Sequence, residues 1–316
     1  MTIVKKPSKA ARMSRHANLA EQFFKKLTPE RRKLWGVEQA EQGKRGTTTL
    51  SISHPAGLVA LSGFLKRLAN KRANKRSEPS PVFCRGEVAW HETLVPSALR
   101  HVKSQNELDS IISVEDALEK EIKNRLGHRM KRFSERHFSA ILQHYGVRTS
   151  WIDLVDNLFV AVWFALHERH TDENSQCYYK PSSRQTGWIH FIRQKIDSHP
   201  KLRIRDLRSE YHSLSLRPHA QHAITATRWT RQHWRLDNLD LSPYVVASVK
   251  IPNLPKLWKL QGHMWSQEFF FPTPKHDHTY SVLLRRETAD ILDAVAKEFG
   301  LPKQQLGKID LYKHKT

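Results

Sequence analysis

The sequence predicts an α+β fold, with a mixed sheet and packed helices, preceded by a basic helical N-terminal extension. Short apolar runs typical of strands are scattered between helical segments, and no regular strand–helix–strand alternation joins them. Residues 157–166 are apolar nearly all round, which indicates a helix buried inside the domain. A hydrophobic content of 39% in 316 residues is enough for an ordinary packed core.

Composition divides the chain into three parts. Residues 1–78 form the predicted basic helical extension, 79–300 the main domain, and 301–316 a basic C-terminal tail. The boundary falls in the Ser- and Pro-rich segment 77–81, because two prolines so close together break any helix.

The predicted elements follow from periodicity and from start and stop signals. In the extension, Thr28 and Pro29 are a typical N-cap and first-turn pair, so a helix begins there and ends near Gly43. Apolar residues at helical spacing predict further helices over 19–27, 57–68, 108–124, 138–145, 157–166 and 288–299. Residues typical of strands predict strands over 82–84, 149–152, 188–192, 220–227, 244–251 and 268–271, while 167–185 is a polar connection.

Charge is the strongest compositional signal. The chain has 53 Lys and Arg against 31 Asp and Glu, a net charge of +22, and such an excess favours polyanionic partners, most simply nucleic acid. Basic pairs recur along the end of the helix that begins near residue 57, and we assign nucleic-acid binding to Lys66, Arg67, Lys71, Arg72, Lys75 and Arg76. The alternative is a solvated helix end, where cations are favoured by the helix dipole.

Several classes of protein are excluded or disfavoured. No apolar run approaches the roughly 18 residues of a membrane span, so no membrane partner is expected. The two cysteines form no C-x-x-C pair, and with no signal peptide the expected compartment is cytoplasmic. We predict no metal site, because His219-x-x-His222 and His276-x-His278 lack a third ligand at suitable spacing. Phosphate-binding loops and nucleophile elbows are also absent from the sequence.

Residues 138–168 are the most informative stretch. A helix over 138–145 ends at Gly146, a short strand follows, and Asp153 arrives as that strand ends, just before the buried helix. His144 lies in the last turn of the first helix. Polar groups at strand ends beside buried helices are expensive unless satisfied, and ligand sites are often built there.

The stretch QHYG, a short strand, an Asp and an apolar N-x-x-x-A helix resembles the FRG domain, named for an N-terminal Phe-Arg-Gly. Phe83-Cys84-Arg85-Gly86 resembles that opening signature, with Cys84 inserted. The segment from Arg217 to Ile224 resembles the R-x-x-A-Q-x-G-x-F segment of the family, with Ala in place of Gly, and Phe271-Pro272 its late F-P pair. The family is functionally uncharacterised, so the resemblance implies a structural unit over about 82–290, of prokaryotic or phage type, but no reaction.

Resemblance and pattern together select the candidate site. We assign ligand binding to Arg85, Gly86 and Arg217, and catalysis to His144, Asp153 and Gln221. An Arg at a strand end can hold a phosphate by a bidentate contact, and a following Gly lets a ligand approach the backbone.

Each of these residues also has a purely structural interpretation. Arg85 can pair internally with Asp153, and His144 can be a core histidine bonded to backbone. Asp153 can N-cap the next helix, and Gln221 can tie a loop.

Three functional interpretations remain open. The first is a protein that binds nucleic acid or another polyanion, has a nucleotide pocket around Arg85, His144, Asp153 and Gln221, and needs no cofactor. The second is an NAD-using transferase or glycohydrolase: the order of Arg85, the strand ending at Asp153 and Gln221 resembles ADP-ribosyltransferases, which implies that Arg85 binds the NAD diphosphate. The third is a non-catalytic interaction module.

Overall fold

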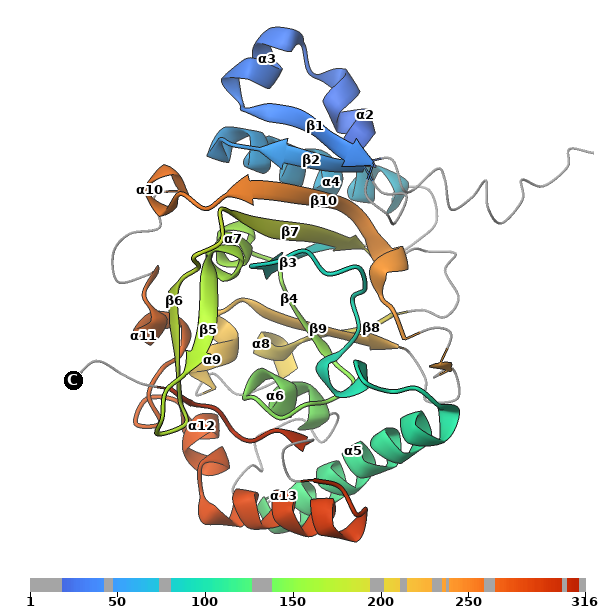
Figure 1. The fold of residues 1–316 in the computed structure, drawn as a ribbon, viewed down its shortest axis with the longest axis vertical. Helices are drawn as coiled ribbons and strands as arrows, with labels where there is room; N and C mark the ends of the chain where they lie inside the picture. Colours follow the sequence, from blue (N-terminus) through green and yellow to red (C-terminus); the bar gives the residue numbers. More distant parts are fainter. Residues whose placement is uncertain are drawn as a thin grey trace, which may run out of the picture.

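The fold is built on a mixed eight-stranded sheet with helices on both sides (Figure 1). The computed structural model describes residues 19–42, 48–73, 81–126, 138–193, 202–210, 215–228, 235–236, 239–258, 265–302 and 306–312, and every structural statement below concerns these residues. In their order across the sheet, the strands are β1 (Val37–Gln42), β2 (Thr48–Ile52), β10 (Val245–Pro252), β7 (Thr186–Arg193), β3 (Val82–Glu87), β4 (Ile152–Val155), β9 (Ala223–Arg228) and β8 (Leu202–Asp206). Only β2 and β10 pair in parallel, and the other neighbours are antiparallel.

A second, three-stranded sheet lies beside the first. It consists of β5 (His167–Thr171), β6 (Gln176–Pro181) and β11 (Leu311–Tyr312), with β6 in the middle. β5 and β6 form an antiparallel hairpin, and the late strand β11 joins β6 in parallel.

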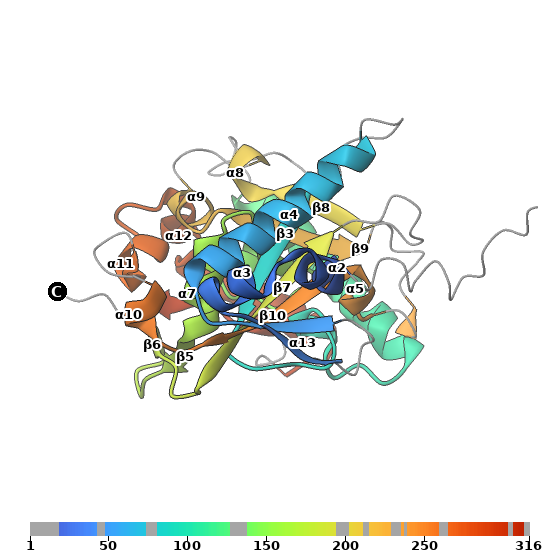
Figure 2. The same cartoon turned by 90° about the horizontal axis from the view of Figure 1, so that it is seen from above.

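The helices surround both sheets. They are α2 (Leu19–Lys26), α3 (Pro29–Leu34), α4 (Pro55–Ala73), α5 (Gln105–Leu126), α6 (Phe138–His144), α7 (Leu158–Leu166), α8 (Leu207–Glu210), α9 (Leu216–Ala220), α10 (Pro255–Trp258), α11 (Gln267–Phe270), α12 (His278–Leu283) and α13 (Arg286–Glu298). α5 and α13 pack against each other at the end of the molecule opposite β1 and β2 (Figure 1). α4 crosses the sheet and contacts β2 and β3, as the view from above shows (Figure 2). Within the described ranges, no helix is both long and apolar enough to cross a membrane.

Helix α7 is the centre of the core. Asn157 is its N-cap, and the Asn157 side chain accepts hydrogen bonds from the backbone N–H groups of Phe159 (2.9 Å) and Val160 (3.4 Å). The helix packs on β3 and β7 where each strand has a glycine. A Cβ at Gly86 would collide with the carbonyl oxygen of Ala161, and a Cβ at Gly187 with that of Ala165. The helix backbone therefore rests directly on the sheet.

The predicted α+β class with a mixed sheet is confirmed, and so are the helices around 108–124, 157–166 and 288–299. Three predicted elements are wrong. The helix predicted to run from Pro29 to near Gly43 ends at Leu34, and residues 37–42 form the strand β1. The polar connection over 167–185 contains the β5–β6 hairpin, whose charged and aromatic residues show no apolar alternation. The predicted strand at 268–271 is the short helix α11, which Ser266 caps by accepting from the N–H of Phe269.

The sheet also crosses the predicted domain boundaries. β1 and β2 lie in the extension, which was predicted to be helical, yet they belong to the same sheet as β10 of the main domain, with which β2 pairs. Residues 306–312 were predicted as part of a basic tail, but Leu306, Ile309 and Tyr312 are buried and β11 pairs with β6. Both segments are therefore integral to the fold.

We expect Gly86→Ala to lower the free energy of unfolding by about 3 kcal/mol, because the new methyl group must push α7 away from β3. Gly63→Ala is the matched control: Gly63 lies in α4, and no heavy atom lies within 4 Å of the place that an added Cβ would take, so Ala should be neutral or stabilise by up to about 1 kcal/mol. Urea unfolding of both variants measures the difference, and equal effects would contradict the close approach.

Candidate functional site

A cavity of about 350 Å³ lies between β3, α6, β4 and the late segment 306–312. Arg85, His144, Asp153 and Gln221, from three separate parts of the sequence, all line it. The structure therefore brings together the four side chains that the sequence singles out, and Gly86 lies beside them. A volume of this size suits a small-molecule ligand.

Arg85 is held by partners that the sequence did not reveal. Its Nε donates to Glu87 Oε1 at 2.7 Å, and its Nη1 donates to the backbone carbonyl of Asp153 at 2.7 Å. Residues 85 and 87 share one face of β3, so the pair follows from strand geometry. The internal partner of Arg85 is thus the Glu87 carboxylate, and the predicted alternative of an ion pair with the Asp153 carboxylate is wrong.

Glu87 is nearly buried, and its charge depends on two cationic neighbours. Burial alone would raise the pKa of Glu87, but Arg85 and His190 outweigh burial and lower this pKa to about 2. His190 Nε2 lies 3.4 Å from Glu87 Oε2, and His190 Nδ1 lies 2.9 Å from the Ser248 hydroxyl. Glu87 is therefore ionised at neutral pH and fixes the guanidinium of Arg85.

His144 and Asp153 form a pair at the cavity wall. His144 Nδ1 lies 3.4 Å from Asp153 Oδ1, and Gln143 Nε2 donates to Asp153 Oδ2 at 3.4 Å. Burial would raise the pKa of Asp153, but the bond from His144 and the charge of Arg85 lower it. The His144 side chain is only 4% exposed, and its Nε2 has no hydrogen-bond partner among the described residues. Asp153 lies within β4 and does not cap α7, since Asn157 does.

Gln221 lies in the turn between α9 and β9, outside the strand in which it was predicted to lie. Its side chain is buried, and Nε2 donates to the carbonyl of Phe270 at 2.7 Å. This bond ties α11 to the α9–β9 turn, so Gln221 contributes to the wall of the cavity through a fixed orientation.

Arg217 does not line the cavity. It is fully buried, and its guanidinium lies over the rings of Tyr145 (4.2 Å), Tyr280 (4.5 Å), Tyr312 (4.8 Å) and Phe271 (5.5 Å). Its Nη1 donates to the carbonyl of His144 at 3.4 Å. Arg217 thus braces the end of α6 from behind through cation–π contacts, and a ligand in the cavity does not meet it.

Two more arginines line the cavity and lie outside the predicted set. Arg169 pairs with Asp310, which raises the pKa of Arg169 although burial opposes this. Arg148 is exposed, and no carboxylate among the described residues pairs with it. Arg148 lies two residues after Gly146, where the helix that carries His144 ends. This position in the turn beside His144 is a sequence signal that could have identified Arg148.

Aromatic rings form another wall of the cavity. Phe271 is stacked against both Tyr312 (centroids 4.2 Å apart) and Tyr179 (4.9 Å), whose own ring centroids are 6.4 Å apart. All three line the cavity, and Tyr312 and Asp310 belong to the segment that the sequence assigned to a tail. Their contribution depends on long-range strand pairing that periodicity does not reveal.

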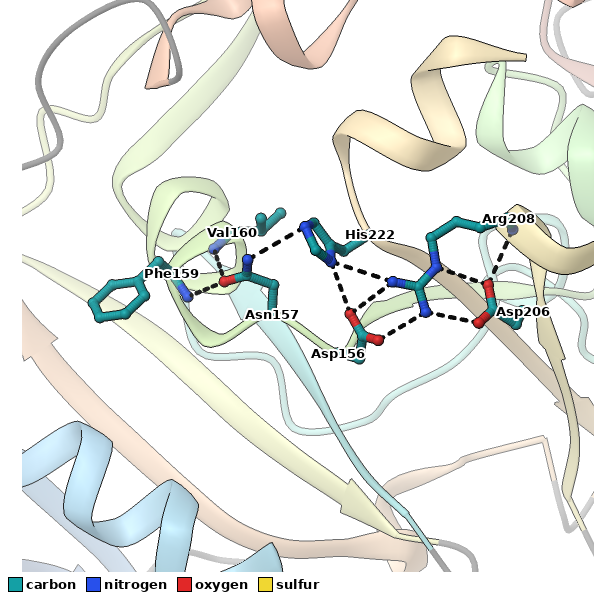
Figure 3. Close-up of polar contacts among 7 residues, drawn as sticks. All are labelled: Asp156, Asn157, Phe159, Val160, Asp206, Arg208 and His222. Atoms are coloured by element: carbon teal, nitrogen blue, oxygen red, sulfur yellow. Dashed lines mark hydrogen bonds and ion pairs between the residues drawn. The ribbon is translucent and has the colours of Figure 1, made fainter. Parts of the chain in front are cut away.

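A polar cluster next to Gln221 fastens the ends of three neighbouring strands (Figure 3). Arg208 donates to both oxygens of Asp156 (3.2 and 2.7 Å) and to Asp206 (2.9 and 2.7 Å). His222, at a positive φ of 51°, points its Nδ1 to Asp156 (3.1 Å) and its Nε2 to Asn157 (3.4 Å). The cluster thereby holds the turn that presents Gln221 and the residue that caps α7.

Gly86 lines the cavity, so its predicted role in ligand approach stays a prediction, and the structure gives it a second role in helix packing. The space that a side chain would occupy is filled by the backbone of α7, so Gly86 serves helix packing. Lys66 and Arg67 are exposed on α4, while the side chains of Lys71 and Arg72, and all of Lys75 and Arg76, lie outside the described residues. Among the described residues no group of three or more His, Cys, Asp or Glu is arranged to hold a metal ion.

Comparison with known proteins identifies one family. The FRG domain matches residues 80–174, which confirms the resemblance to this family for the segment that contains Arg85, His144, Arg148 and Asp153. No curated protein and no solved structure matches the chain.

We expect Glu87→Gln to lower the free energy of unfolding by about 3 kcal/mol at pH 7, from the shift of the Glu87 pKa from 4.5 to about 2. Because the pKa is lower in the folded state, this stabilisation is present above about pH 5 and disappears as the pH falls to about 2. Stability measured from pH 7 to 2 should therefore converge for the two proteins. Glu121→Gln, which breaks an exposed pair with Arg125, is the control and should change stability by less than about 0.5 kcal/mol.

Proposed function

We propose that the cavity binds a nucleotide through its phosphate, and that the His144–Asp153 pair exchanges a proton with the bound ligand. The observation that carries this proposal is that the three arginines lining the cavity differ in their partners. Arg85 and Arg169 are already paired, with Glu87 and Asp310, while Arg148 has no carboxylate partner among the described residues. A phosphate oxygen is the natural partner for such a guanidinium.

The other walls suit the rest of a nucleotide. Phe164, Tyr179, Phe271 and Tyr312 supply apolar surface for a flat ring. Ser97, Gln143 and Gln221 supply polar atoms that can orient a sugar. Most of these polar groups already have protein partners, so the ligand would meet a wall whose geometry is set in advance.

Proton exchange is assigned to His144 on geometric grounds. Asp153 lies 3.4 Å from Nδ1 and favours the tautomer that carries a proton there, which leaves Nε2 as the acceptor. Nε2 has no hydrogen-bond partner among the described residues, and His144 lines the cavity. Arg217 holds the carbonyl of His144 from behind and so acts as a positioning residue.

An NAD-using reaction is a second candidate, favoured by the order of the strands. β3, β4 and β9 are immediate neighbours in the sheet, and they carry or adjoin Arg85, Asp153 and Gln221 respectively. The carboxylate available to such a reaction is Asp153, because Gln221 is bonded to the carbonyl of Phe270. In a glycohydrolase reaction the bond between ribose and nicotinamide breaks and a water molecule supplies the hydroxyl group.

Polyanion binding by the N-terminal extension stays a separate prediction. The net charge of +22 supports it, and Lys66 and Arg67 are exposed on α4. This surface is distinct from the cavity, whose lining includes neither residue.

Nucleoside monophosphates and diphosphates should bind the protein, whereas the corresponding nucleosides should bind at least about tenfold more weakly. Arg148→Gln should reduce nucleotide affinity about tenfold or more, while Arg286→Gln, an exposed arginine in α13, should leave it unchanged. Calorimetric titration measures these affinities. If oligonucleotide affinity falls steeply with salt concentration and is unchanged by Arg148→Gln, we would attribute this binding to the basic N-terminal surface. The nucleotide proposal fails if both arginine variants bind nucleotides as the parent protein does.

Under the second candidate, incubation with NAD should release nicotinamide, measured by chromatography. Asp153→Asn should slow the release about a hundredfold or more, because it removes the carboxylate that orients His144. Asp290→Asn, on the exposed side of α13, should keep the full rate. The absence of any release by the parent protein would eliminate this candidate and leave nucleotide binding untouched.

A further inference from the structure

A second hollow, of about 570 Å³, adjoins the cavity. The two share Ser97 and Arg148 as lining residues, so they meet at the guanidinium that the proposed function assigns to a phosphate. The second hollow lies over the beginning of α5, where Asn106 and Ser110 line it. A ligand bound at Arg148 therefore has space on both sides.

A second arginine, Arg100, lies near Arg148 in the chain fold, although it lines neither hollow. Arg100 precedes His101, a residue of the second hollow, and donates from Nε to the carbonyl of Val95 at 3.4 Å. Burial and the positive charges of Arg85 and Arg148 lower the pKa of Arg100, which Glu87 only partly offsets. Like Arg148, Arg100 has no carboxylate partner within hydrogen-bond distance among the described residues. The guanidinium that both hollows share, that of Arg148, suits the phosphates that link two nucleosides.

The chemistry of the second hollow suits an uncharged polar group with a flat apolar part. His101, Asn106 and Ser110 offer hydrogen-bonding groups, while Val102, Ile111 and Leu301 offer apolar surface. Glu107 also lines the hollow, but its carboxylate accepts a hydrogen bond from the backbone N–H of Lys103 at 2.7 Å. A nucleoside combines these two kinds of surface.

We propose that the second hollow is a subsite for the far half of a dinucleotide, with one nucleotide in the cavity, the linking phosphates on Arg148, and the second nucleoside against α5. This inference rests on the proposed function, since it extends the same ligand past the same arginine. It adds a binding site, formed by residues 101–111 and Leu301, that the cavity alone does not require.

The test compares AMP with NAD and diadenosine diphosphate by calorimetric titration. In the parent protein the two dinucleotides should bind about tenfold or more tightly than AMP. Ser110→Phe places a ring in the second hollow and should remove this advantage while AMP affinity stays the same. Ser113→Phe makes the same change on the exposed side of α5, outside the hollow, and should alter neither affinity. Asn106→Trp is a second way to fill the hollow and should act like Ser110→Phe.

The outcomes separate this inference from the proposed function. If AMP binds through Arg148 but the dinucleotides bind no more tightly, the subsite is wrong and the nucleotide cavity stands. The subsite is equally wrong if Ser110→Phe and Asn106→Trp behave like Ser113→Phe. If neither AMP nor the dinucleotides bind, both the subsite and the proposed function are overturned.

Discussion

The direct contact between the backbone of α7 and the strands β3 and β7 is the constraint on which the rest of the site depends. Gly86 and Gly187 leave no side chain between helix and sheet, so the helix lies as close as backbone atoms permit. Close packing in a core transmits displacement, because interiors have few voids to absorb it. The contact places β3, and with it Arg85 and Glu87, relative to the Asn157 end of α7. A shift of α7 would therefore displace both Arg85 and the polar cluster around Asp156.

The distribution of charge inside the cavity differs from that of the whole chain. The chain as a whole has a net charge of +22. Ion pairs that are exposed to solvent contribute little to stability, about 0–1 kcal/mol each. In the cavity, by contrast, Arg85 and Arg169 are matched by Glu87 and Asp310. Breaking the largely buried Arg85–Glu87 pair leaves a desolvated charge and costs several kcal/mol, whereas the Arg169 side chain is exposed. Most charges on the cavity wall are therefore neutralised by partners within the protein. Under the proposed function, Arg148, which has no carboxylate partner among the described residues, binds the phosphate of the ligand.

The sequence predicts this site to a useful degree, and the failures have physical causes. Arg85, His144, Asp153 and Gln221 could be selected because each lies in or next to a short apolar run, a local signal that requires no knowledge of the topology, and all four line the cavity. Glu87 could have been predicted as a neighbour of Arg85, since alternate residues of a strand share a face. Asp310 and Tyr312 could not have been predicted, because their positions depend on the parallel pairing of β11 with β6, which lies more than a hundred residues earlier in the chain. The packing role of Gly86 was not predicted, because a glycine beside an arginine fits helix packing as well as ligand approach.

The two walls of the cavity come from different parts of the chain, and this limits what the match to the FRG domain implies. Residues 80–174, which match that domain, supply Arg85, Arg148 and Arg169 together with His144 and Asp153. Gln221 and the stacked rings of Tyr179, Phe271 and Tyr312 lie outside the matched segment. Charged groups hold the anionic part of a ligand, whereas the shape of an apolar wall discriminates between rings. Under the proposed function, the FRG segment would therefore supply the groups that bind the phosphate, while most of the apolar wall for the ring would come from residues beyond that segment.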